Sequence, residues 1–398
     1  MRIVHIEDFF HPEAGYQINI IAKYMAQKRH EVYILCSPLD IMPAYLTDFF
    51  GKSDIEQKDE AFFSNTGVKI IRVPTYKYIS GRSIYKRQIF KTVDELKPDV
   101  LYVHGNDTLI GIQYIFKSHK LGYPIILDSH MLEMASKNKL NKWFHTFYRL
   151  LVTPRIIKEN LRIIRTQNSN YVKDVLGIPL EQCPWISVGS DLSLFKENNE
   201  VRTIFRKENE IPLDAYVILY LGKLDENKGG LFLAQSIQKR ICSDSEKKLV
   251  FLVVGNSSGE YGDNVESLLA VSENRIIRFP TQRYIDLPQF YQASDVVVFP
   301  KQCSLSFFDA QACGLPVIFE DNEVNISRAQ NNNAILFKEN DSQDFIAKLQ
   351  EVISMDEIEY QEMRNNARNY IKKEYNYDTL TNLYLDIIKI QLDNYHNK

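Results

Sequence analysis

The stretch YVILYLGKLDENKGG, residues 216–230, joins an apolar run to a polar loop that holds two lysines, Lys223 and Lys228. The run is nearly continuous in Val, Ile and Leu, which is typical of strands covered on both faces. Gly222 ends the run, and we expect a helix to begin after the loop. A buried strand, a loop and a crossover helix form the repeating unit of a parallel sheet.

The same unit recurs along the chain. Helical faces alternate with the apolar runs, for example at residues 18–25 and 380–387. This alternation predicts an α/β protein built from doubly wound sheets, with two domains facing each other across a cleft. The apolar runs are RIVHI, HEVYILC, VKIIRV, DVLYVHG and PIILDSH in the first half, and YVILYLG, KLVFLVVG, RIIRF, VVVFP, PVIF and AILF in the second.

Two domains are also expected from length, because 398 residues exceed what one hydrophobic core normally serves. The strand pattern restarts after the polar stretch 195–215, which we interpret as the linker. This predicts an N-terminal domain over residues 1–195 and a C-terminal domain over residues 196–398. We expect the last helix, about 378–395, to pack back on the N-terminal domain.

Composition excludes several classes of protein. Five scattered cysteines, an odd number without a CxxC pair, indicate reduced thiols and a cytoplasmic location. The start MRIVHIEDFF carries acids where an export signal is apolar, and no run of 18 apolar residues predicts a membrane span. Lys and Arg outnumber Asp and Glu by 24 to 17 before residue 166, but are outnumbered 34 to 24 after it. No nucleic-acid motif accompanies the basic half, so nucleic acid is not an expected partner.

The loop with Lys223 and Lys228 allows two interpretations. Lysines in a turn are commonly solvated, and a glycine-bracketed turn needs no ligand. Alternatively, cations around the start of a helix bind a phosphate or diphosphate. Ligands of doubly wound sheets bind beyond the carboxyl ends of the strands, where this loop lies. The loop lacks GxGxxG, so a nicotinamide or flavin cofactor is not indicated.

A second loop of this kind is KQCSLSFFDAQACGLPVI, residues 301–318. We interpret Ser306 as the N-cap of a short helix that Gly314 ends, with Asp309 three residues on in a variant capping box. Asp309 is then either a capping acid or an acceptor for the two hydroxyls of a ribose. With the lysine loop, the second interpretation predicts a site for a nucleoside diphosphate.

These segments resemble the retaining glycosyltransferases of the GT-B fold, family 4, which have two Rossmann-like domains. The resemblance runs nearly from end to end. It includes the opening with Gly15, the strand PIILDSHMLEM that ends near His130, and the stretch 165–195, where Val188 to Asp191 replaces the Asn-Gly-Val-Asp of relatives. Residues 222–229 resemble the family's Gly-Arg-Leu-Asp…Lys-Gly signature.

The resemblance implies a hexosyl- or N-acetylhexosaminyl-type transferase that moves a sugar from a nucleotide-diphosphate donor, expected to be a UDP-sugar. Lys223, where relatives have Arg, and Lys228 would hold the diphosphate, although Lys lacks the bidentate fork of Arg. Gly15 and Gly222 would border the donor, with Gly15 letting the backbone approach a phosphate. His130 would lie beside the donor sugar, or would be a satisfied histidine at a strand end.

The sequence departs from the family at its motif of two glutamates. Asp309 occupies the second position, but Lys301 stands eight residues before it, so the first acid is absent. Ser304 and Ser306 would take over its contact with the donor. The departure favours an alternative function, a catalytically inactive nucleotide-sugar-binding subunit of a glycosyltransferase complex. A nucleotide-sugar epimerase with the same fold is a third interpretation.

No metal and no cofactor are expected. The chain has no DxD motif and no paired histidines at ligand spacing. In a retaining enzyme of this fold the departing diphosphate takes the proton of the acceptor, so the protein must mainly stabilise charge.

The acceptor would bind the N-terminal domain, and the resemblance implies a lipid-linked or saccharide acceptor in bacterial surface polysaccharide or glycoconjugate synthesis. Residues 137–165 hold eight basic residues and one acid, Glu159, and residues 76–91 hold five basic residues and no acid. They are either solvated faces above core-facing aromatics, or a peripheral contact with an anionic membrane on its inner face. The interleaved apolar residues are Trp143, Phe144, Phe147, Tyr148 and Leu150.

Overall fold

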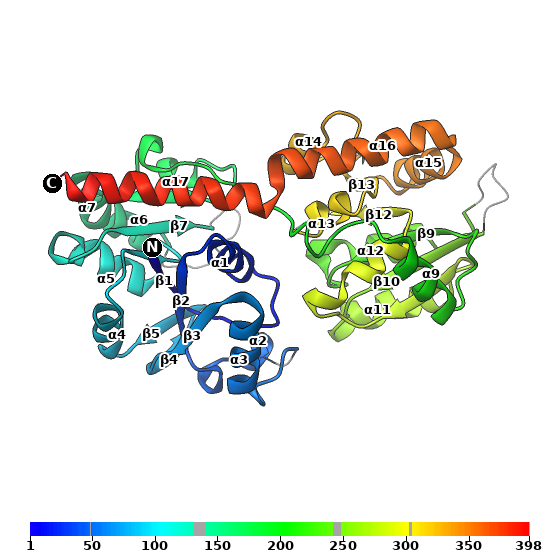
Figure 1. The fold of residues 1–398 in the computed structure, drawn as a ribbon. Coiled ribbons are helices and arrows are strands. Elements are labelled where there is room, and N and C mark those ends of the chain that lie inside the picture. The colour runs from blue at the N-terminus through cyan, green and yellow to red at the C-terminus, as the bar shows by residue number, and fades with distance from the viewer. Residues whose placement is uncertain (48, 131–140, 242–247, 302–304, 398) are drawn as a thin grey trace. The chain divides into compact units, whose positions relative to one another are not determined.

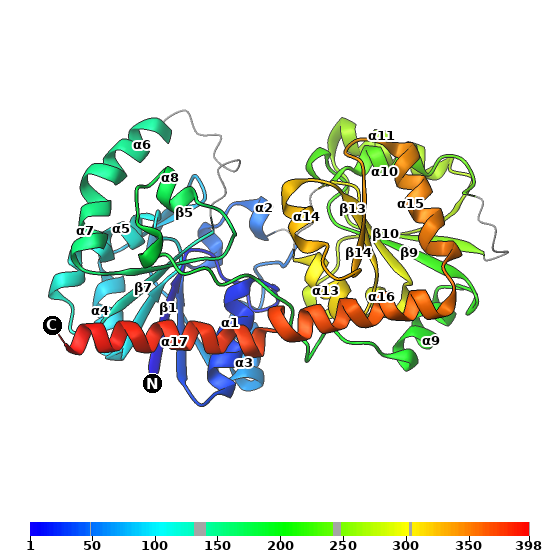
Figure 2. The same ribbon diagram turned by 90° about the horizontal axis from the view of Figure 1, so that it is seen from above.

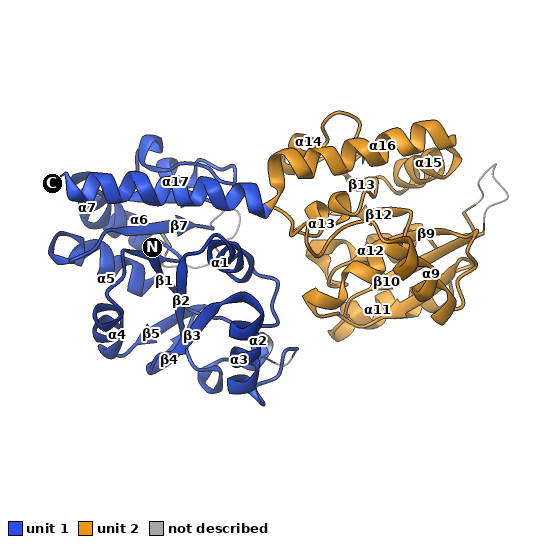
Figure 3. Cartoon of the chain, viewed as in Figure 1, with its two compact units in different colours: residues 1–188, 377–398 blue, residues 189–376 orange. Residues whose placement is uncertain are grey.

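The chain forms two compact units. The computed structural model describes residues 1–47, 49–130, 141–241, 248–301 and 305–397. Unit 1 comprises residues 1–188 and 377–398, and unit 2 comprises residues 189–376 (Figure 3). The division falls before residue 189 instead of at 195/196, because the intervening residues pack within unit 2. There the Ser190 N–H donates to Tyr375 O at 2.9 Å, and the Phe195 ring lies 5.7 Å from that of Tyr291.

Unit 1 is built on a six-stranded parallel sheet with the order β3-β2-β1-β6-β7-β8. The central strands are buried on both faces, as their apolar sequences predict. The strands are β1 (Arg2–Glu7), β2 (Glu31–Cys36), β3 (Val68–Arg72), β6 (Val100–Val103), β7 (Ile125–Ser129) and β8 (Arg162–Arg165).

Helices cover this sheet, and the last of them comes from the far end of the chain. Helix α17 (Tyr377–His396) lies along unit 1 (Figure 1). Its Tyr384 is fully buried, and the hydroxyl accepts a hydrogen bond from Gln17 Nε2 at 2.6 Å. This helix therefore packs within unit 1, against α1 and β7. The other helices of the unit are α1 (Gln17–Gln27), α2 (Ala44–Thr47), α3 (Ile55–Thr66), α4 (Gln88–Leu96), α5 (Leu109–Lys117), α6 (Asn141–Phe147), α7 (Thr153–Lys158) and α8 (Tyr171–Asp174).

A small antiparallel hairpin, β4 (Thr75–Ile79) and β5 (Arg82–Tyr85), lies over the carboxyl end of β1. The Ser83 hydroxyl donates to Asp8 O at 3.0 Å, and the Tyr85 hydroxyl donates to Glu7 O at 2.8 Å. The basic stretch 76–91 therefore has a structural function, because its hairpin is hydrogen-bonded to the segment at the end of β1. This function does not depend on the charges of the stretch.

Unit 2 repeats the architecture with a second six-stranded parallel sheet, ordered β11-β10-β9-β12-β13-β14. The prediction of two doubly wound parallel sheets is therefore confirmed. The strands are β9 (Tyr216–Leu221), β10 (Leu249–Val254), β11 (Arg275–Phe279), β12 (Val296–Phe299), β13 (Val317–Glu320) and β14 (Ala334–Phe337). The helices are α9 (Asn199–Glu208), α10 (Gly230–Ser236), α11 (Gly259–Ala270), α12 (Pro288–Ala293), α13 (Ser306–Ala312), α14 (Glu323–Arg328), α15 (Ser342–Ser354) and α16 (Glu357–Tyr370).

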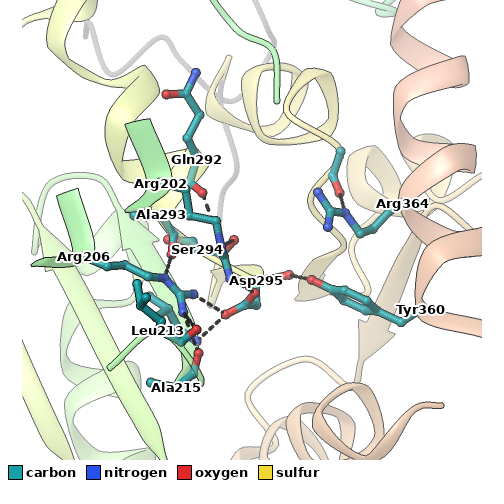
Figure 4. Close-up of polar contacts among 12 residues, drawn as sticks. Arg202, Arg206, Leu213, Ala215, Gln292, Ala293, Ser294, Asp295, Tyr360 and Arg364 are labelled. Atoms are coloured by element: carbon teal, nitrogen blue, oxygen red, sulfur yellow. Dashed lines mark hydrogen bonds and ion pairs between the residues drawn. The ribbon is translucent and has the colours of Figure 1, made fainter. Parts of the chain in front are cut away.

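The interpretation of residues 195–215 as a linker is wrong, because α9 occupies the middle of that stretch and is anchored in unit 2. Arg206 is fully buried, and its guanidinium donates to the carbonyls of Leu213, Ala215 and Ala293 (Figure 4). It also pairs with Asp295 at 2.8 Å. A buried charge is tolerated when it is paired and hydrogen-bonded in this way.

Candidate functional site

The lysine loop of unit 2 leaves the carboxyl end of β9 and is held by its own side chains. The Tyr220 hydroxyl donates to the backbone oxygen of Lys223 at 2.8 Å and lies 3.4 Å from that of Lys228. The Asp225 carboxylate accepts the Lys228 N–H at 3.0 Å and caps a single 3₁₀ turn, Glu226–Lys228. Lys223 is exposed and Lys228 is partly buried. The structure thus places both lysines in one fixed loop before α10.

This loop lies at the topological switch point of the sheet. From the central strands β9 and β12 the chain continues to opposite sides of the sheet, to β10 and to β13. Gly229 adopts φ +71°, and an ideal Cβ there would lie 3.0 Å from Pro300 Cβ. The loops after β9 and β12 are therefore in direct contact.

A third loop joins them. An ideal Cβ on Gly255, which follows β10, would lie 1.8 Å from the carbonyl oxygen of Gly222. Only glycine permits this approach of one backbone to the other. The contact explains glycine at position 255 and not at 222, where an ideal Cβ would lie 3.7 Å from the Tyr220 hydroxyl oxygen, an ordinary distance. A role for Gly222 beside the donor stays a prediction.

The predicted capping box in α13 is wrong. Ser306 is the first helical residue, and Leu305 is the N-cap, without a side-chain bond. Asp309 is only 3% exposed, and its Oδ1 accepts a hydrogen bond from Ser190 Oγ at 2.6 Å. Burial raises the pKa of Asp309 to about 8. A role for Asp309 toward a ribose stays a prediction, and Ser304 lies outside the described residues.

The predicted residues of unit 1 lie in loops at the carboxyl edge of its sheet. Gly15 is partly exposed between β1 and α1. His130 directly follows β7, and its side chain is 45% exposed. Its Nε2 lies 3.3 Å from Asp128 Oδ2, and its Nδ1 lies 3.1 Å from the Thr166 hydroxyl.

His130 belongs to a buried polar cluster that the sequence reading missed. His104 Nδ1 lies 2.7 Å from Asp128 Oδ2, and His104 Nε2 lies 3.0 Å from His5 Nδ1. Polar residues at the ends of the neighbouring runs DVLYVHG and PIILDSH are the signal that could have revealed it, since such ends meet at one edge of a parallel sheet.

The charged groups of this cluster shift one another's pKa values. Burial alone would raise the pKa of Asp128, but His130 and His104 lower it overall, so the group is a carboxylate. Burial alone would lower the pKa of His130, but Asp128 raises it to about 9. Next to them, burial and the charge of Glu7 raise the pKa of Asp8 to about 7.

The same side chains are the one candidate group for a metal ion found among the described residues. Atoms of His104, Asp128 and His130 that could be ligands lie within 4.8 Å of one another. A ring nitrogen that carries a proton toward a carboxylate offers no lone pair to a metal. The distances therefore favour an ion-pair cluster, and the absence of a metal cofactor stays a prediction.

Comparison with known proteins shows a similarity between unit 2 and one protein family. Residues 215–355, which include the lysine loop and α13, match the family described as Glycosyl transferases group 1. The D-inositol 3-phosphate glycosyltransferase of Corynebacterium jeikeium (strain K411) is 28% identical over 174 residues, 41% of this chain and 42% of that relative. The alignments span between 38% and 58% of the length of the first three curated relatives.

A longer alignment links the chain to the UDP-Gal:alpha-D-GlcNAc-diphosphoundecaprenol alpha-1,3-galactosyltransferase of Escherichia coli. The two are 24% identical over 320 residues, 75% of this chain and 78% of that relative.

Solved structures share the fold over nearly the whole chain. A glycosyltransferase from Rickettsia africae ESF-5 superposes with a TM-score of 0.73 at 13% identity, covering 98% of both chains. Anabaena Alr3699/HepE, in complex with UDP and glucose, superposes with a TM-score of 0.70 at 14% identity, covering 98% of this chain and 99% of that one. Residues 215–355 are therefore similar to the group 1 glycosyl transferases, and the chain shares its fold with solved glycosyltransferases.

Proposed function

We propose that this protein is a retaining glycosyltransferase that moves a sugar from a nucleotide-diphosphate donor to a saccharide or lipid-linked acceptor. The observation that carries the proposal is the lysine loop. It lies at the switch point of a sheet whose residues match group 1 glycosyl transferases, with Lys223 exposed beside the contacting loop after β12. This is where doubly wound sheets bind their ligands.

The reaction breaks the bond between the anomeric carbon of the donor sugar and the diphosphate oxygen, and forms a bond from that carbon to an acceptor oxygen. The acceptor's proton passes to the departing diphosphate. No side-chain base is then needed, and Lys223 and Lys228 would stabilise the charge that grows on the leaving group. The retaining outcome comes from the family resemblance, and the proposed independence from metal comes from the lack of a DxD motif and of paired histidines at ligand spacing in the sequence.

We propose a UDP-sugar as the donor and a hexose or N-acetylhexosamine as the transferred sugar. The name of the Escherichia coli relative specifies UDP-Gal, and the Anabaena protein of the same fold was solved with UDP and glucose. The name of that relative also specifies a diphosphoundecaprenol-linked acceptor. This supports the same class of acceptor for the present chain, in bacterial surface polysaccharide or glycoconjugate synthesis.

A lipid-linked acceptor fits an apolar and basic surface on unit 1. The helical stretch from α6 to α7 runs along the side of unit 1 (Figure 2). It exposes 79% of Trp143, 68% of Leu150 and 56% of Leu151. Two aromatic residues of this stretch contribute to the core instead: Tyr148 is buried, and Phe144 is partly buried against the core. The apolar residues of the stretch are therefore divided between the core and the surface. Part of the basic stretch, residues 137–140, lies outside the described residues.

Among the described residues, no helix combines the length and the hydropathy needed to cross a bilayer. We propose that the α6–α7 surface makes peripheral contact with an anionic membrane on the cytoplasmic side. Exposed Trp and Leu would enter the interface, and each nearby cation would contribute roughly 1 kcal/mol.

The donor site is tested with Lys228→Ala. Losing a charge-assisted contact to the diphosphate costs ~1.5–3 kcal/mol, so UDP affinity should fall roughly 10- to 100-fold and transfer should slow. Lys207→Ala, an exposed lysine on α9 of the same unit, is the control. Unchanged affinity in Lys228→Ala would mean that this lysine does not hold the diphosphate.

A turnover assay with a UDP-sugar distinguishes an enzyme from a catalytically inactive binding subunit. The absent first acid of the family motif and the burial of Asp309 favour the inactive subunit. Donor hydrolysis or transfer by the purified protein identifies an enzyme. UDP-sugar binding without turnover identifies the binding subunit.

Membrane contact is tested by flotation with vesicles that contain anionic lipid. The double variant Trp143→Ser, Leu150→Ser should float less than the wild type, whereas Leu213→Ser, an exposed leucine of unit 2, should not differ. Binding that is indifferent to salt, lipid charge and these substitutions would exclude this surface as the contact.

A further inference from the structure

A third lysine, Lys301, stands beside the lysine loop of unit 2. It is the second residue after β12, and it is partly buried. Its backbone nitrogen lies 3.5 Å, and its Cγ 3.1 Å, from the position that a Cβ on Gly229 would take. The stem of Lys301 therefore lies against Gly229, the residue that follows Lys228. The loops after β9 and β12 thus bring three lysines to the switch point of this sheet, with Lys223 as the third.

The ammonium group of Lys301 forms no ion pair within unit 2 as far as the described residues show. None of their carboxylates lies within 4.0 Å of it. The acid on which its charge acts is Glu320, the last residue of β13, which is only 6% exposed. Glu320 Oε1 accepts the Asn340 N–H at 3.2 Å, and burial raises the pKa of Glu320 although Lys301 opposes this shift. Glu320 is thus held by a contact of its own.

The number of cations at the switch point exceeds what a diphosphate needs. In a nucleotide-sugar each phosphoryl group carries one negative charge, and Lys223 and Lys228 can match the two. Lys301 then remains as an additional, partly desolvated cation, and an unpaired charge in such a place favours the binding of a further anion. Besides its diphosphate, the part of the donor that can supply an anion is the sugar. A hexose becomes anionic when its C6 is a carboxylate.

We propose that Lys301 binds the carboxylate of a hexuronic acid, so that the preferred donor is a UDP-hexuronic acid and not a neutral UDP-hexose. The inference rests on the proposed function and narrows its hexose to an acidic one. Lys301 is then a residue that determines donor specificity. It stands eight residues before Asp309, where the family motif has its first acid, so the charge at this position of the sequence is reversed. A cation favours an anionic sugar that an acid would repel.

Calorimetric titration with UDP, UDP-glucose and UDP-glucuronic acid tests the proposal. The wild type should bind UDP-glucuronic acid roughly 10-fold more tightly than UDP-glucose, as expected for one charge-assisted hydrogen bond. Lys301→Met keeps the apolar stem against Gly229 but removes the charge. It should abolish this preference and leave the affinity for UDP unchanged. Lys301→Glu should reverse the preference, because the new carboxylate repels that of the sugar.

Three controls separate the role of Lys301 from other effects. Lys207→Met applies the same substitution to an exposed lysine on α9 and should change none of the three affinities. Lys301→Arg keeps the charge and should keep the preference. Lys228→Ala should weaken the binding of UDP and of both UDP-sugars alike, because it acts on the diphosphate that all three ligands share.

Two results would overturn the inference and leave the proposed function standing. One is a wild type that binds UDP and both UDP-sugars without preferring the acidic sugar, a comparison that needs no variant and no assumption about its folding. The other is a folded Lys301→Met variant that loses affinity for UDP as well, since Lys301 would then hold the diphosphate. If the wild type binds neither UDP nor either UDP-sugar, the proposed donor itself is wrong and the inference fails with it.

Discussion

Replacing Asp309 by asparagine should stabilise unit 2, and the gain should grow with pH. Asp309 is buried, accepts one hydrogen bond from Ser190, and faces the like charge of Asp191. An asparagine keeps the shape and an oxygen that can accept from Ser190, but it never ionises. Asp309→Asn therefore removes the cost of holding a carboxylic acid in its protonated form.

The magnitude follows from the two pKa values. The ordinary pKa of Asp309 is 3.8, and burial raises it to about 8 in the folded protein. The unfolded chain loses this proton first, so the stability contributed by Asp309 is complete below about pH 4 and is lost as pH rises to about 8. Each pH unit in that window costs ~1.4 kcal/mol, which amounts to on the order of 4 kcal/mol at pH 7.

Urea unfolding at pH 5, 6, 7 and 8 measures this effect. Both tryptophans, Trp143 and Trp185, lie in unit 1, so fluorescence follows that unit while far-UV circular dichroism follows both. The difference between Asp309→Asn and the wild type should appear only by circular dichroism and should increase with pH. Ser190→Ala, which removes a bond that lowers the pKa of Asp309, should extend the window to higher pH.

A stability difference that stays constant from pH 5 to pH 8 would refute this reasoning. It would mean that Asp309 ionises in the folded protein as readily as in the unfolded chain.

Three further predictions concern the framework of unit 2. Arg206→Ala should lower the free energy of unfolding by ~3–5 kcal/mol in urea titrations, because three backbone carbonyls lose their donor and Asp295 keeps only Arg202 of its two arginine partners. Tyr220→Phe should cost ~1 kcal/mol and weaken UDP binding in calorimetry, since the phenol holds the backbone of loop 223–228. Gly229→Ala should weaken UDP binding more strongly than Tyr220→Phe, because φ is +71° at this position and the new Cβ, 3.0 Å from Pro300 Cβ, would push the loop after β12 aside.

The sheets could be predicted from the sequence because their strands are apolar on both faces. The run 216–221 contains no polar position, apart from tyrosine hydroxyls, that would distinguish an inner from an outer face, and this fits its place in the middle of unit 2. Helix α9 was missed because its sequence is polar and it buries Arg206, a residue type normally taken as a mark of the surface.

The site was predicted only where local sequence determines it. The lysine loop could be found because Asp225, which caps its turn, and Gly229, which ends it, lie within a few residues of both lysines. The capping role of Asp309 was predicted wrongly because its partner, Ser190, lies 119 residues away in the sequence, and no local pattern indicates such a tertiary hydrogen bond.

The histidine cluster was missed for a related reason. His5 lies on β1 and His104 directly follows β6, and the two rings meet because β1 and β6 pair. A histidine inside the apolar run RIVHI was nevertheless a visible anomaly, since a buried imidazole normally needs a hydrogen-bonding partner.

The position of α17 has a consequence for biosynthesis. A ribosome completes residues 189–376 before it makes the helix that covers α1 and β7 in unit 1. Unit 2 can thus fold during translation, whereas unit 1, most of which is synthesised earlier, still lacks α17 and exposes the apolar face that α17 covers. A nonsense mutation shortly after codon 376 would therefore damage mainly the half of the protein that was synthesised first.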